Sequence, residues 1–330
     1  MQSRRILSAM ALAVALALPL AAVPGVAQAQ QQPLDLATFV VGFPAGGATD
    51  AVARLVAEAV QGKYAKGVVV MNKAGTGGQI AAAYVKDQPA DGRTLLFTPA
   101  FPMVIHPHTY KQVRYDTLRD FMPVAPTHFG TLALSLGPGA PAEIKTLAEF
   151  ITWAKANPAK ATFGAPTGGS QHFTGLMLTR AAAFKLDLVP YKGGAPSVQD
   201  ALGGHIPAII TPLAEVLEHW RNGQLRILAT TARERSALAP DIATFNEQGF
   251  PKVVVQDWTG FLAPAGTPPE IVAGANAAIS EALQAPKVRE AMAKLGMEAG
   301  AQTPQAFAQT VQESWERYRD IVKETGFKVE

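Results

Sequence analysis

The hydrophobic and polar positions of this chain follow two patterns in turn. Short apolar runs, typical of buried strands, precede segments whose apolar residues recur every three or four positions, as on one face of a helix. Strands are predicted at residues 36–43, 68–71, 94–98, 131–136, 161–165, 187–190, 208–211, 226–230 and 253–255. Helices are predicted at residues 50–64, 79–85, 147–156, 172–184, 196–202, 213–221, 269–283, 286–295 and 304–325. This alternation predicts an α/β fold of βαβ units with parallel sheets.

The last three predicted helices follow one another without a strand between them. They begin at Pro269, Pro286 and Pro304, and proline suits the first turn of a helix. We expect this helical tail to pack on the first domain, so that the chain crosses between two domains near residues 124–129 and 254–260. Two crossings make a hinge and a cleft, and ligands of such folds bind at the carboxyl ends of the strands. The predicted first lobe is residues 30–126 and 256–330, and the second lobe is residues 127–255.

Four loops rich in glycine or threonine follow predicted strands, at residues 43–50, 98–101, 164–172 and 191–196. In the first loop, Gly46 and Gly47 leave backbone N–H groups uncovered, and Thr49 and Asp50 stand where a helix cap belongs. A strand, a glycine loop and a helix start together present unpaired amides and a positive helix end to a small anion. A single loop of this kind is usually only a tight turn, but four of them at strand ends favour a shared anion-binding cleft.

Asp50 has two interpretations. A carboxylate beside an anion site repels the ligand. We therefore expect Asp50 to accept N–H groups of the first helical turn and to organise the loop. Direct contact with the ligand is the alternative.

Three other motifs have ordinary structural explanations. Residues 168–172 (GGSQH) lack the final glycine of a nucleophile elbow, and Ser170 and His172, two positions apart, point in different directions on a helix. Residues 75–78 (GTGG) lack the Gly-Lys-Ser/Thr ending of a phosphate loop and are interpreted as a helix start. His106 and His108 have no carboxylate or cysteine at metal-ligand spacing, which favours a turn. We therefore predict no catalytic residue, no metal and no cofactor.

The N-terminus has the pattern of a signal peptide. Arg4 and Arg5 precede an apolar stretch at residues 6–20, and residues 27–29 read Ala-Gln-Ala, a cleavage signature. A membrane anchor is the alternative, but the stretch is shorter than the ~20 residues that a spanning helix needs. The sequence has no cysteine, which excludes both a disulfide and a lipid-modified cysteine. These features predict a soluble periplasmic protein that is cleaved after Ala29.

Length and charge exclude some classes of protein. A mature chain of about 300 residues is long enough for two domains. Loss of Arg4 and Arg5 with the leader lowers the formal net charge from +3 to +1. No stripe of basic residues alternates with aromatic ones, so a nucleic-acid partner is not expected.

Many ordered motifs resemble one family over essentially the whole mature chain, namely the substrate-binding proteins of tripartite tricarboxylate transporters, also called Bug receptors. The resemblance is carried by residues 41–50 (VGFPAGGATD), 53–54 (AR), 70–75 (VMNKAG), 77–78 (GG), 91–96 (DGRTLL), 115–124 (YDTLRDFMPV), 155–158 (KANP), 170–172 (SQH), 189–196 (VPYKGGAP), 200–204 (DALGG) and 261–268 (FLAPAGTP).

The resemblance implies a two-lobed periplasmic-binding-protein fold of the Venus-flytrap type, type II-like, with the C-terminal helical segment packed on the first lobe. Such receptors capture small organic acids and deliver them to a membrane permease. It also implies that loops 46–50 and 168–172 hold the ligand carboxylate, partly through ordered water. We expect a monomer that binds a mono- or dicarboxylate. The predicted ligand-binding residues are Phe43, Gly46, Gly47, Ala48, Thr49, Asp50, Thr98, Phe101, Gly168, Gly169, Ser170, Gln171, His172, Tyr191, Gly194 and Thr211.

One departure from the family bears on the ligand. Many relatives have an aspartate shortly after the strand that follows Gly204, where this chain has Thr211 and Pro212. An acid there could pair with a ligand amine, so its absence disfavours an amino-acid ligand and removes a repulsion on a second carboxylate. Two other functions could use the same cleft. One is that of a receptor that senses its ligand for a signalling partner, and the other is that of a hydrolase, for which no nucleophile–base pair stands out.

The leader generates the first prediction. Protein exported by a Gram-negative host should begin at Gln30, or at its cyclised form, because the Ala-Gln-Ala signature directs cleavage after Ala29. N-terminal sequencing measures this directly. A mature chain that still carries Arg4 and Arg5 would contradict it.

Overall fold

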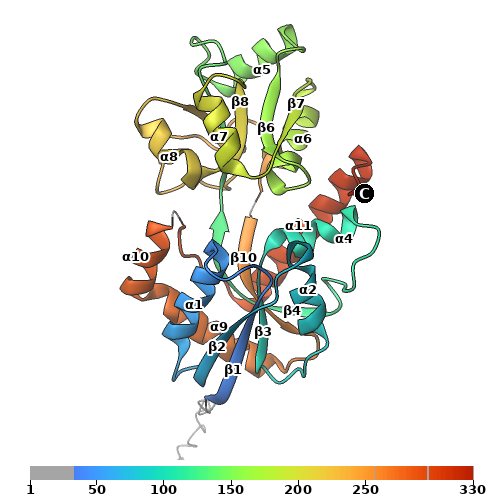
Figure 1. Ribbon diagram of the computed structural model, residues 1–330, viewed down its shortest axis with the longest axis vertical. Helices are drawn as coiled ribbons and strands as arrows, with labels where there is room; N and C mark the ends of the chain where they lie inside the picture. Colours follow the sequence, from blue (N-terminus) through green and yellow to red (C-terminus); the bar gives the residue numbers. More distant parts are fainter. Residues whose placement is uncertain (1–32, 256, 296, 330) are drawn as a thin grey trace, which may run out of the picture. The chain divides into compact units, whose positions relative to one another are not determined.

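The computed structural model describes residues 33–255, 257–295 and 297–329, and the predicted leader at residues 1–29 lies outside them (Figure 1). The strands are β1 (Leu34–Val41), β2 (Ala65–Asn72), β3 (Thr94–Pro99), β4 (Phe121–Gly130), β5 (Leu132–Leu136), β6 (Thr162–Pro166), β7 (Asp187–Tyr191), β8 (Ala208–Pro212), β9 (Arg226–Thr230) and β10 (Asp257–Pro264). The helices are α1 (Ala48–Val60), η1 (Thr76–Gly78), α2 (Gln79–Lys86), α3 (Ala100–Val104), α4 (His106–Thr109), α5 (Leu147–Ala156), α6 (Ser170–Ala182), α7 (Gly194–Leu202), α8 (Leu213–Arg221), η2 (Pro251–Val253), α9 (Pro269–Gln284), α10 (Pro286–Lys294) and α11 (Pro304–Thr325).

The strands form two five-stranded sheets. The first sheet has the order β2-β1-β3-β10-β4, and the second has the order β7-β6-β8-β5-β9. In the first, β1 is parallel to β2 and β3, whereas β10 is antiparallel to β3 and β4. In the second, β6 is parallel to β7 and β8, whereas β5 is antiparallel to β8 and β9. The α/β class is confirmed, but the expectation of purely parallel sheets is wrong.

The reversed strands have a common cause. β5 and β10 are the strands that receive the chain directly from the other sheet, β5 from β4 through Thr131 and β10 through the long segment after β9. A parallel neighbour needs a crossover that returns the chain to the starting end of the sheet. A chain that enters a sheet at the carboxyl ends of its parallel strands has no such crossover. The entering strand therefore runs antiparallel to its neighbours.

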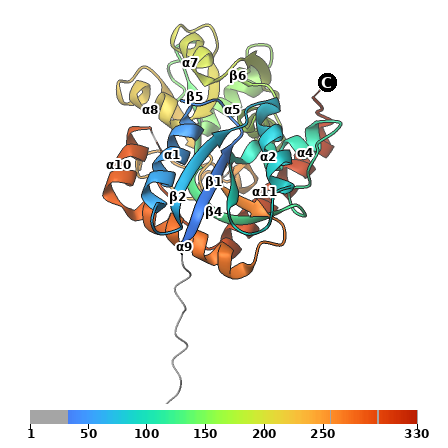
Figure 2. The same cartoon turned by 60° about the horizontal axis from the view of Figure 1, so that its bottom comes forward.

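Both faces of the first sheet are covered. Along β1, Phe39 and Val41 belong to a core shared with α1, α9 and α10, whereas Val40 belongs to a core shared with α2, α3 and α11. Successive side chains of β1 therefore point to opposite faces of the sheet, as they do in any strand. Figure 2 shows α1 on one side of the sheet and α2 with α11 on the other. Burial on both faces explains why β1 appears in the sequence as an unbroken apolar run.

The predicted helical tail packs as expected. α9 lies against α1 and β4, and α11 lies against β4, α3 and α6. Tyr318 of α11 is 2 % exposed and belongs to the same core as Trp258 of β10 and Phe173 of α6. One apolar core therefore runs from the first sheet into the second. The predicted lobe boundaries remain predictions.

Two segments differ from the sequence-based prediction. The pattern predicts β4 only as an extended crossing, because the segment contains Pro123 and Pro126, which weaken a strand pattern. The strand lies at the edge of the sheet, where proline is tolerated. The strand predicted at residues 253–255 is not formed. Val253 ends the short helix η2, and Val255 donates its N–H to the Thr231 carbonyl (3.0 Å) outside any strand. Val253, Val254 and Val255 are buried because this segment covers the core, so the apolar run indicated burial and not a strand.

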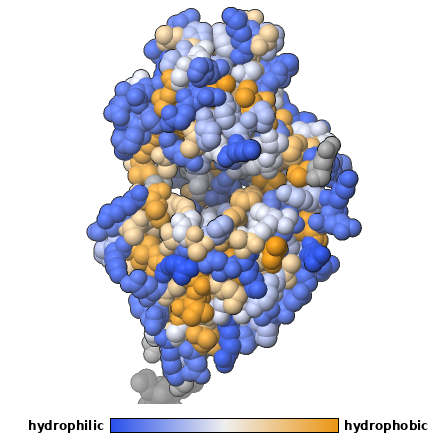
Figure 3. Space-filling view, in the orientation of Figure 1, coloured by the Kyte–Doolittle hydropathy of each residue, from blue (hydrophilic) through white to orange (hydrophobic). Residues whose placement is uncertain are grey.

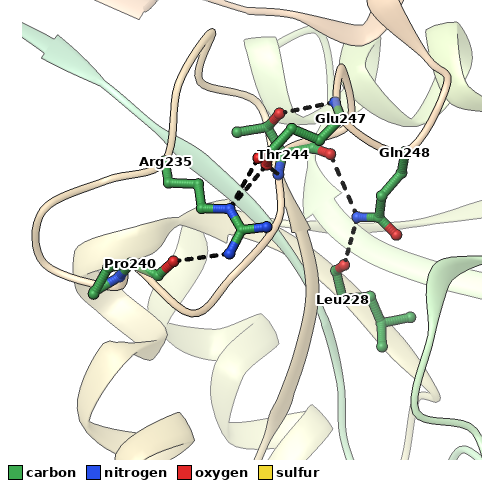
Figure 4. Close-up of polar contacts among 6 residues, drawn as sticks. All are labelled: Leu228, Arg235, Pro240, Thr244, Glu247 and Gln248. Carbon is green, nitrogen blue, oxygen red and sulfur yellow. Dashed lines mark hydrogen bonds and ion pairs between the residues drawn. The ribbon is translucent and has the colours of Figure 1, made fainter.

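The long segment between β9 and β10 is braced by a reciprocal pair of hydrogen bonds (Figure 4). The Thr244 Oγ1 accepts from the Glu247 N–H (3.1 Å), and the Glu247 carboxylate accepts from the Thr244 N–H (2.7 Å). This is the pattern of a helix capping box. Arg235 adds two bonds to the same carboxylate (3.0 and 3.1 Å), and Gln248 donates to the Leu228 carbonyl (2.9 Å). The brace fixes the segment that leads from the second sheet to β10.

This brace generates the second prediction. Thr244→Ala should lower the free energy of unfolding by about 1–2 kcal/mol, because the partly buried Glu247 N–H loses its acceptor. Denaturant unfolding at constant m-value measures it. Thr152→Ala is the matched control, since the exposed Thr152 only donates to the Ala148 carbonyl of its own helix, and a change within about 0.5 kcal/mol is expected. Equal losses in both variants would contradict a bracing role.

Candidate functional site

A large cavity lies where the carboxyl ends of strands from both sheets meet. Its volume is about 1000 Å³. The face in Figure 3 is hollowed in this region, with apolar and polar residues along the rim. The lining residues are Ala48, Pro99, Phe101, His106, Thr109, Tyr110, His128, Phe129, Gly130, Thr131, Leu132, Pro166, Thr167, Gly168, Gly169, Ser170, Gln171, Pro212, Leu213, Ala214, Glu215, Ser236, Leu238, Asp257, Thr259, Leu295, Met297, Glu298, Phe327, Lys328 and Val329.

One wall of the cavity begins at the start of α1. The helix starts at Ala48 and its N-cap is Gly47, which makes no side-chain cap bond. The first backbone bond of the helix runs from the Ala51 N–H to the Gly47 carbonyl (2.9 Å). A helix leaves its first-turn N–H groups without partners inside the helix. This start therefore offers backbone donors beside the cavity.

Asp50 organises the preceding loop, though not in the expected way. Its carboxylate accepts from the Gly46 N–H (2.9 Å), from Arg54 Nε (2.9 Å) and from Asn72 Nδ2 (2.8 Å). Asn72 also donates to the Phe43 carbonyl (3.0 Å), which ties the loop to the end of β2. The amide bonded by Asp50 thus lies before the helix, not in its first turn. Gly46 has φ +83°, a left-handed conformation that suits glycine.

The opposite wall contains the start of α6. This helix begins at Ser170, with Gly169 as N-cap, and its first backbone bond is from the Phe173 N–H to the Gly169 carbonyl (3.2 Å). Ser170 donates its hydroxyl to the carboxylate of Asp257, the first residue of β10. His172 Nδ1 accepts from the Gly168 N–H (3.2 Å). Ser170 therefore donates to a carboxylate, and His172 serves the loop backbone, so the two do not act as a nucleophile and its base.

The cavity brings together some of the predicted residues. Ala48, Phe101, Gly168, Gly169, Ser170 and Gln171 line it. Ten others lie outside the lining: Phe43, Gly46, Gly47, Thr49, Asp50, Thr98, His172, Tyr191, Gly194 and Thr211. Among these ten, the Tyr191 hydroxyl donates to Asp200 (2.6 Å), and Thr98 donates to the Pro99 carbonyl (3.0 Å). Ligand contact by any of the sixteen remains a prediction.

The sequence missed several lining groups. Glu215 stands in the first turn of α8, and Asp257 begins β10. Glu215 lies within the helix predicted at residues 213–221, and Asp257 follows the strand predicted at residues 253–255, so a position shortly after a predicted strand was the available signal. The C-terminal residues Phe327, Lys328 and Val329 also line the cavity and had no such signal. Phe327 packs edge-on against His172 (ring centroids 5.2 Å), and the Val329 N–H donates to the Thr109 carbonyl (2.9 Å), so this tail bridges α4 and the α6 start.

The histidines of the cavity are neutral near physiological pH. Burial lowers the pKa of His106 and that of His128 to about 4. Desolvation raises the pKa of Glu215, and it raises that of Asp257 against the opposing effect of the Ser170 hydrogen bond. In the part of the chain that the structure describes, no group of three or more His, Asp or Glu side chains is placed to hold a metal ion. His106 and His108 belong to the one-turn helix α4 rather than to a plain turn.

A cavity at the strand ends of two α/β sheets, lined by helix starts, defines a solute-binding receptor. Residues 52–327 match the tripartite tricarboxylate transporter family receptor, TctC, and the chain belongs to this family. It is 35% identical over 294 residues to Protein BugT of Bordetella pertussis, covering 88% of this chain and 89% of that protein.

Two solved structures extend the comparison. A TctC solute-binding protein from Polaromonas, without ligand, is 26% identical, with TM-score 0.80, over 88% of this chain and 99% of its own. MatC from Rhodopseudomonas palustris, with bound malate, is 30% identical, with TM-score 0.68, over 88% and 99%. The family consists of periplasmic solute-binding receptors of a carboxylate transporter. The predicted family, periplasmic-binding-protein fold and solute-receptor function are confirmed. Among the described residues, no helix combines the length and apolarity needed to cross a bilayer.

The Asp50 network generates the third prediction. Asp50→Asn should lower the free energy of unfolding near neutral pH, because it removes the ion pair with Arg54 and the charge that attracts the Gly46 amide. The hydrogen bond from Arg54, with those from Gly46 and Asn72, lowers the pKa of Asp50 from 3.8 to about 2. A lowered pKa gives stability that is complete above the unfolded-state value and is lost as the pH falls through the folded-state value.

The difference in unfolding free energy between wild type and Asp50→Asn should therefore shrink as the pH falls from about 4 to about 2. Urea unfolding across that range measures it. Asp35→Asn is the control, because Asp35 pairs with Lys66 at the exposed surface and should matter little. A difference that stays constant over this pH range would contradict the network.

Proposed function

We propose that this receptor binds a small organic carboxylate in the cavity, with the ligand carboxylate held by the first-turn amides of α1 and α6. The observation that carries the proposal is that both helix starts line one cavity, at Ala48 and at residues 168–171. Each start supplies unpaired N–H donors and a positive helix end, which together attract an anion without a cationic side chain. Malate in MatC is a ligand of this chemical class.

The remaining parts of the proposal concern cellular context. The chain is exported, is cleaved after Ala29 and works as a monomer that hands its ligand to the membrane permease of a tripartite tricarboxylate transporter. The ligand-binding residues predicted from the sequence contact the ligand directly or through ordered water, among them Phe43, Thr98, Tyr191, Gly194 and Thr211. The cavity is used for capture and not for catalysis, because His172 accepts from the Gly168 N–H and not from the Ser170 hydroxyl, which donates to Asp257.

The test is a thermal-shift screen of mono- and dicarboxylates followed by calorimetry on the compounds that raise the melting temperature, since a ligand that binds only the folded state stabilises it. Purified wild-type protein should bind at least one carboxylate without converting it. Absence of binding by any carboxylate, or turnover of a bound one, would overturn the proposal.

The α1 start generates the fourth prediction. Gly47→Val should weaken carboxylate binding by about 2 kcal/mol or more, the scale of leaving a charged group poorly bonded. A Cβ at Gly47 would lie 3.5 Å from the Pro44 carbonyl, an ordinary contact, so the loop can keep its conformation while the branched side chain blocks close approach. Gly47→Ala is the matched control, because it also replaces the N-cap glycine but adds only a methyl group. Equal affinity of all three proteins by calorimetry would remove this loop from the site.

A further inference from the structure

Two histidines of the cavity lining, His106 and His128, are each 7 % exposed. Burial lowers the pKa of both to about 4, so both rings are neutral near neutral pH. A neutral imidazole has one nitrogen that donates a hydrogen bond and one that accepts. The bond made at one nitrogen decides which kind the other is. The partner of each Nδ1 atom therefore determines what these rings offer to a ligand.

His106 is left with a donor. Its Nδ1 lies 3.2 Å from the side-chain Nε2 of the buried Gln79. The nitrogen of an amide side chain only donates, so this Nδ1 accepts and the ring proton is on Nε2. The imidazole packs edge-on against Phe101 (ring centroids 5.3 Å) and Tyr110 (4.7 Å), which also line the cavity. His106 thus supplies an oriented N–H group without a charge.

The loop at residues 75–78 makes room for this ring. All four of its residues have positive φ angles, including Thr76 at 44°. A Cβ on Gly77 would lie 2.8 Å from His106 Cε1, which is too close without a shift of one of the two. Gln79 begins α2 directly after the loop. The glycine loop therefore admits the imidazole and also starts the helix that carries its partner.

His128 is left with an acceptor. Its Nδ1 lies 3.1 Å from the Oγ1 of Thr127, and that hydroxyl donates to the Thr259 carbonyl (3.1 Å). A hydroxyl has a single hydrogen, so Thr127 accepts from His128 and the ring proton is on Nδ1. The Nε2 of His128 keeps its lone pair. The two histidines therefore have opposite tautomers.

A β-bulge explains why the side chains of two successive residues meet here. Thr259 of β10 pairs with His128, and Gly260 pairs with Pro126, so Thr127 is an extra residue in β4. Successive side chains of a regular strand point to opposite faces, whereas a bulge redirects a side chain. The bulge therefore brings the Thr127 hydroxyl to the ring that it orients.

The two Nε2 atoms remain for a ligand. Among the described residues, neither Nε2 has a hydrogen-bond partner, and neither belongs to the enclosed polar atoms that lack one. Both are therefore accessible, and both rings line the same cavity. The cavity thus has a neutral donor on α4 and a neutral acceptor on β4.

An acceptor in the cavity distinguishes between carboxylates. An ionised carboxylate group only accepts, so an unsubstituted mono- or dicarboxylate offers no hydrogen to the Nε2 of His128. A ligand hydroxyl offers one. Leaving a buried acceptor without a partner costs free energy, and a site built to bond a hydroxyl rejects the analogue that lacks it.

We propose that the ligand is a hydroxycarboxylate whose hydroxyl donates to the Nε2 of His128, while the Nε2–H of His106 donates to an oxygen of the same ligand. The inference rests on the proposed function, because the helix amides still hold the ligand carboxylate. His128 selects for the hydroxyl. His106 adds affinity for a ligand oxygen of either kind, since hydroxyl and carboxylate oxygens both accept.

The experiment compares hydroxy acids with their deoxy partners by calorimetry near neutral pH. The pairs are glycolate and acetate, lactate and propionate, 3-hydroxybutyrate and butyrate, malate and succinate, and mandelate and phenylacetate. In the pair that binds best, wild type should bind the hydroxy acid about tenfold or more tightly than its deoxy partner.

Variants of the two histidines separate their roles. His128→Asn keeps a polar group near the Nδ1 position and removes Nε2, so the preference for the hydroxy acid should fall to about twofold or less. His128→Gln reaches the Nε2 position and should restore part of the preference. His106→Asn should weaken both acids of a pair alike. His205→Gln is the control, because His205 is an exposed histidine outside the cavity lining, and it should change nothing.

NMR of isotope-labelled imidazole nitrogens tests the tautomers directly in the wild-type protein, with no ligand present. The proton should be on Nε2 in His106 and on Nδ1 in His128. A His128 ring that carries its proton on Nε2 overturns the inference, whether or not the variants fold.

The binding outcomes separate the two proposals. Equal affinity for hydroxy and deoxy acids, or an unchanged preference in His128→Asn, overturns the hydroxycarboxylate inference and leaves the carboxylate receptor intact. Binding of other carboxylates but of no hydroxy acid has the same consequence. Absence of binding by any carboxylate overturns the proposed function, and this inference falls with it.

Discussion

The antiparallel pairing of β10 with β4 is the constraint on which the rest of the structure depends. The two strands pair from Asp257 opposite Gly130 to Pro264 opposite Phe121. β4 leads the chain into the second sheet, and β10 brings it back, so their pairing fixes both passages at once. It also sets Asp257 beside Ser170 of α6 and places the end of β4 at the cavity wall. The lining is therefore assembled where the chain passes between sheets.

The same passages explain how a long apolar core and a polar cavity lie next to each other. Trp258, one residue after Asp257, is fully buried in the core that also holds Phe173 and Tyr318. Because side chains alternate along a strand, β10 directs Trp258 into the core and Asp257 to the cavity side. A single strand thus supplies both the packing that joins the sheets and a charged group of the site.

Carboxylates accompany the starts of α1, α6 and α7, and their partners set their different roles. Asp50 is held by Arg54, Asn72 and the Gly46 amide, so its charge is used within the loop. Asp257 has a serine hydroxyl as its partner, and Glu215 lies over Gly194.

The sequence by itself determined most of the elements, because helical periodicity and short apolar runs are local signals. Helices Leu147–Ala156, Leu213–Arg221 and Pro304–Thr325 lie where the pattern predicted them. It also identified the helix starts at residues 43–50 and 164–172, since glycine and hydroxyl residues mark such loops locally. The strand β4 was hidden by Pro123 and Pro126, whose tolerance depends on an edge position that only the sheet reveals.

Only the tertiary structure decided which residues share the cavity. Glu215, Asp257 and Phe327 are far apart in sequence and carry no common motif, yet all three line it. Their proximity follows from the strand pairing and from the packing of α11 across both sheets, which are non-local interactions. The net charge of a binding cavity is a sum over such distant residues, so no local pattern could have predicted it.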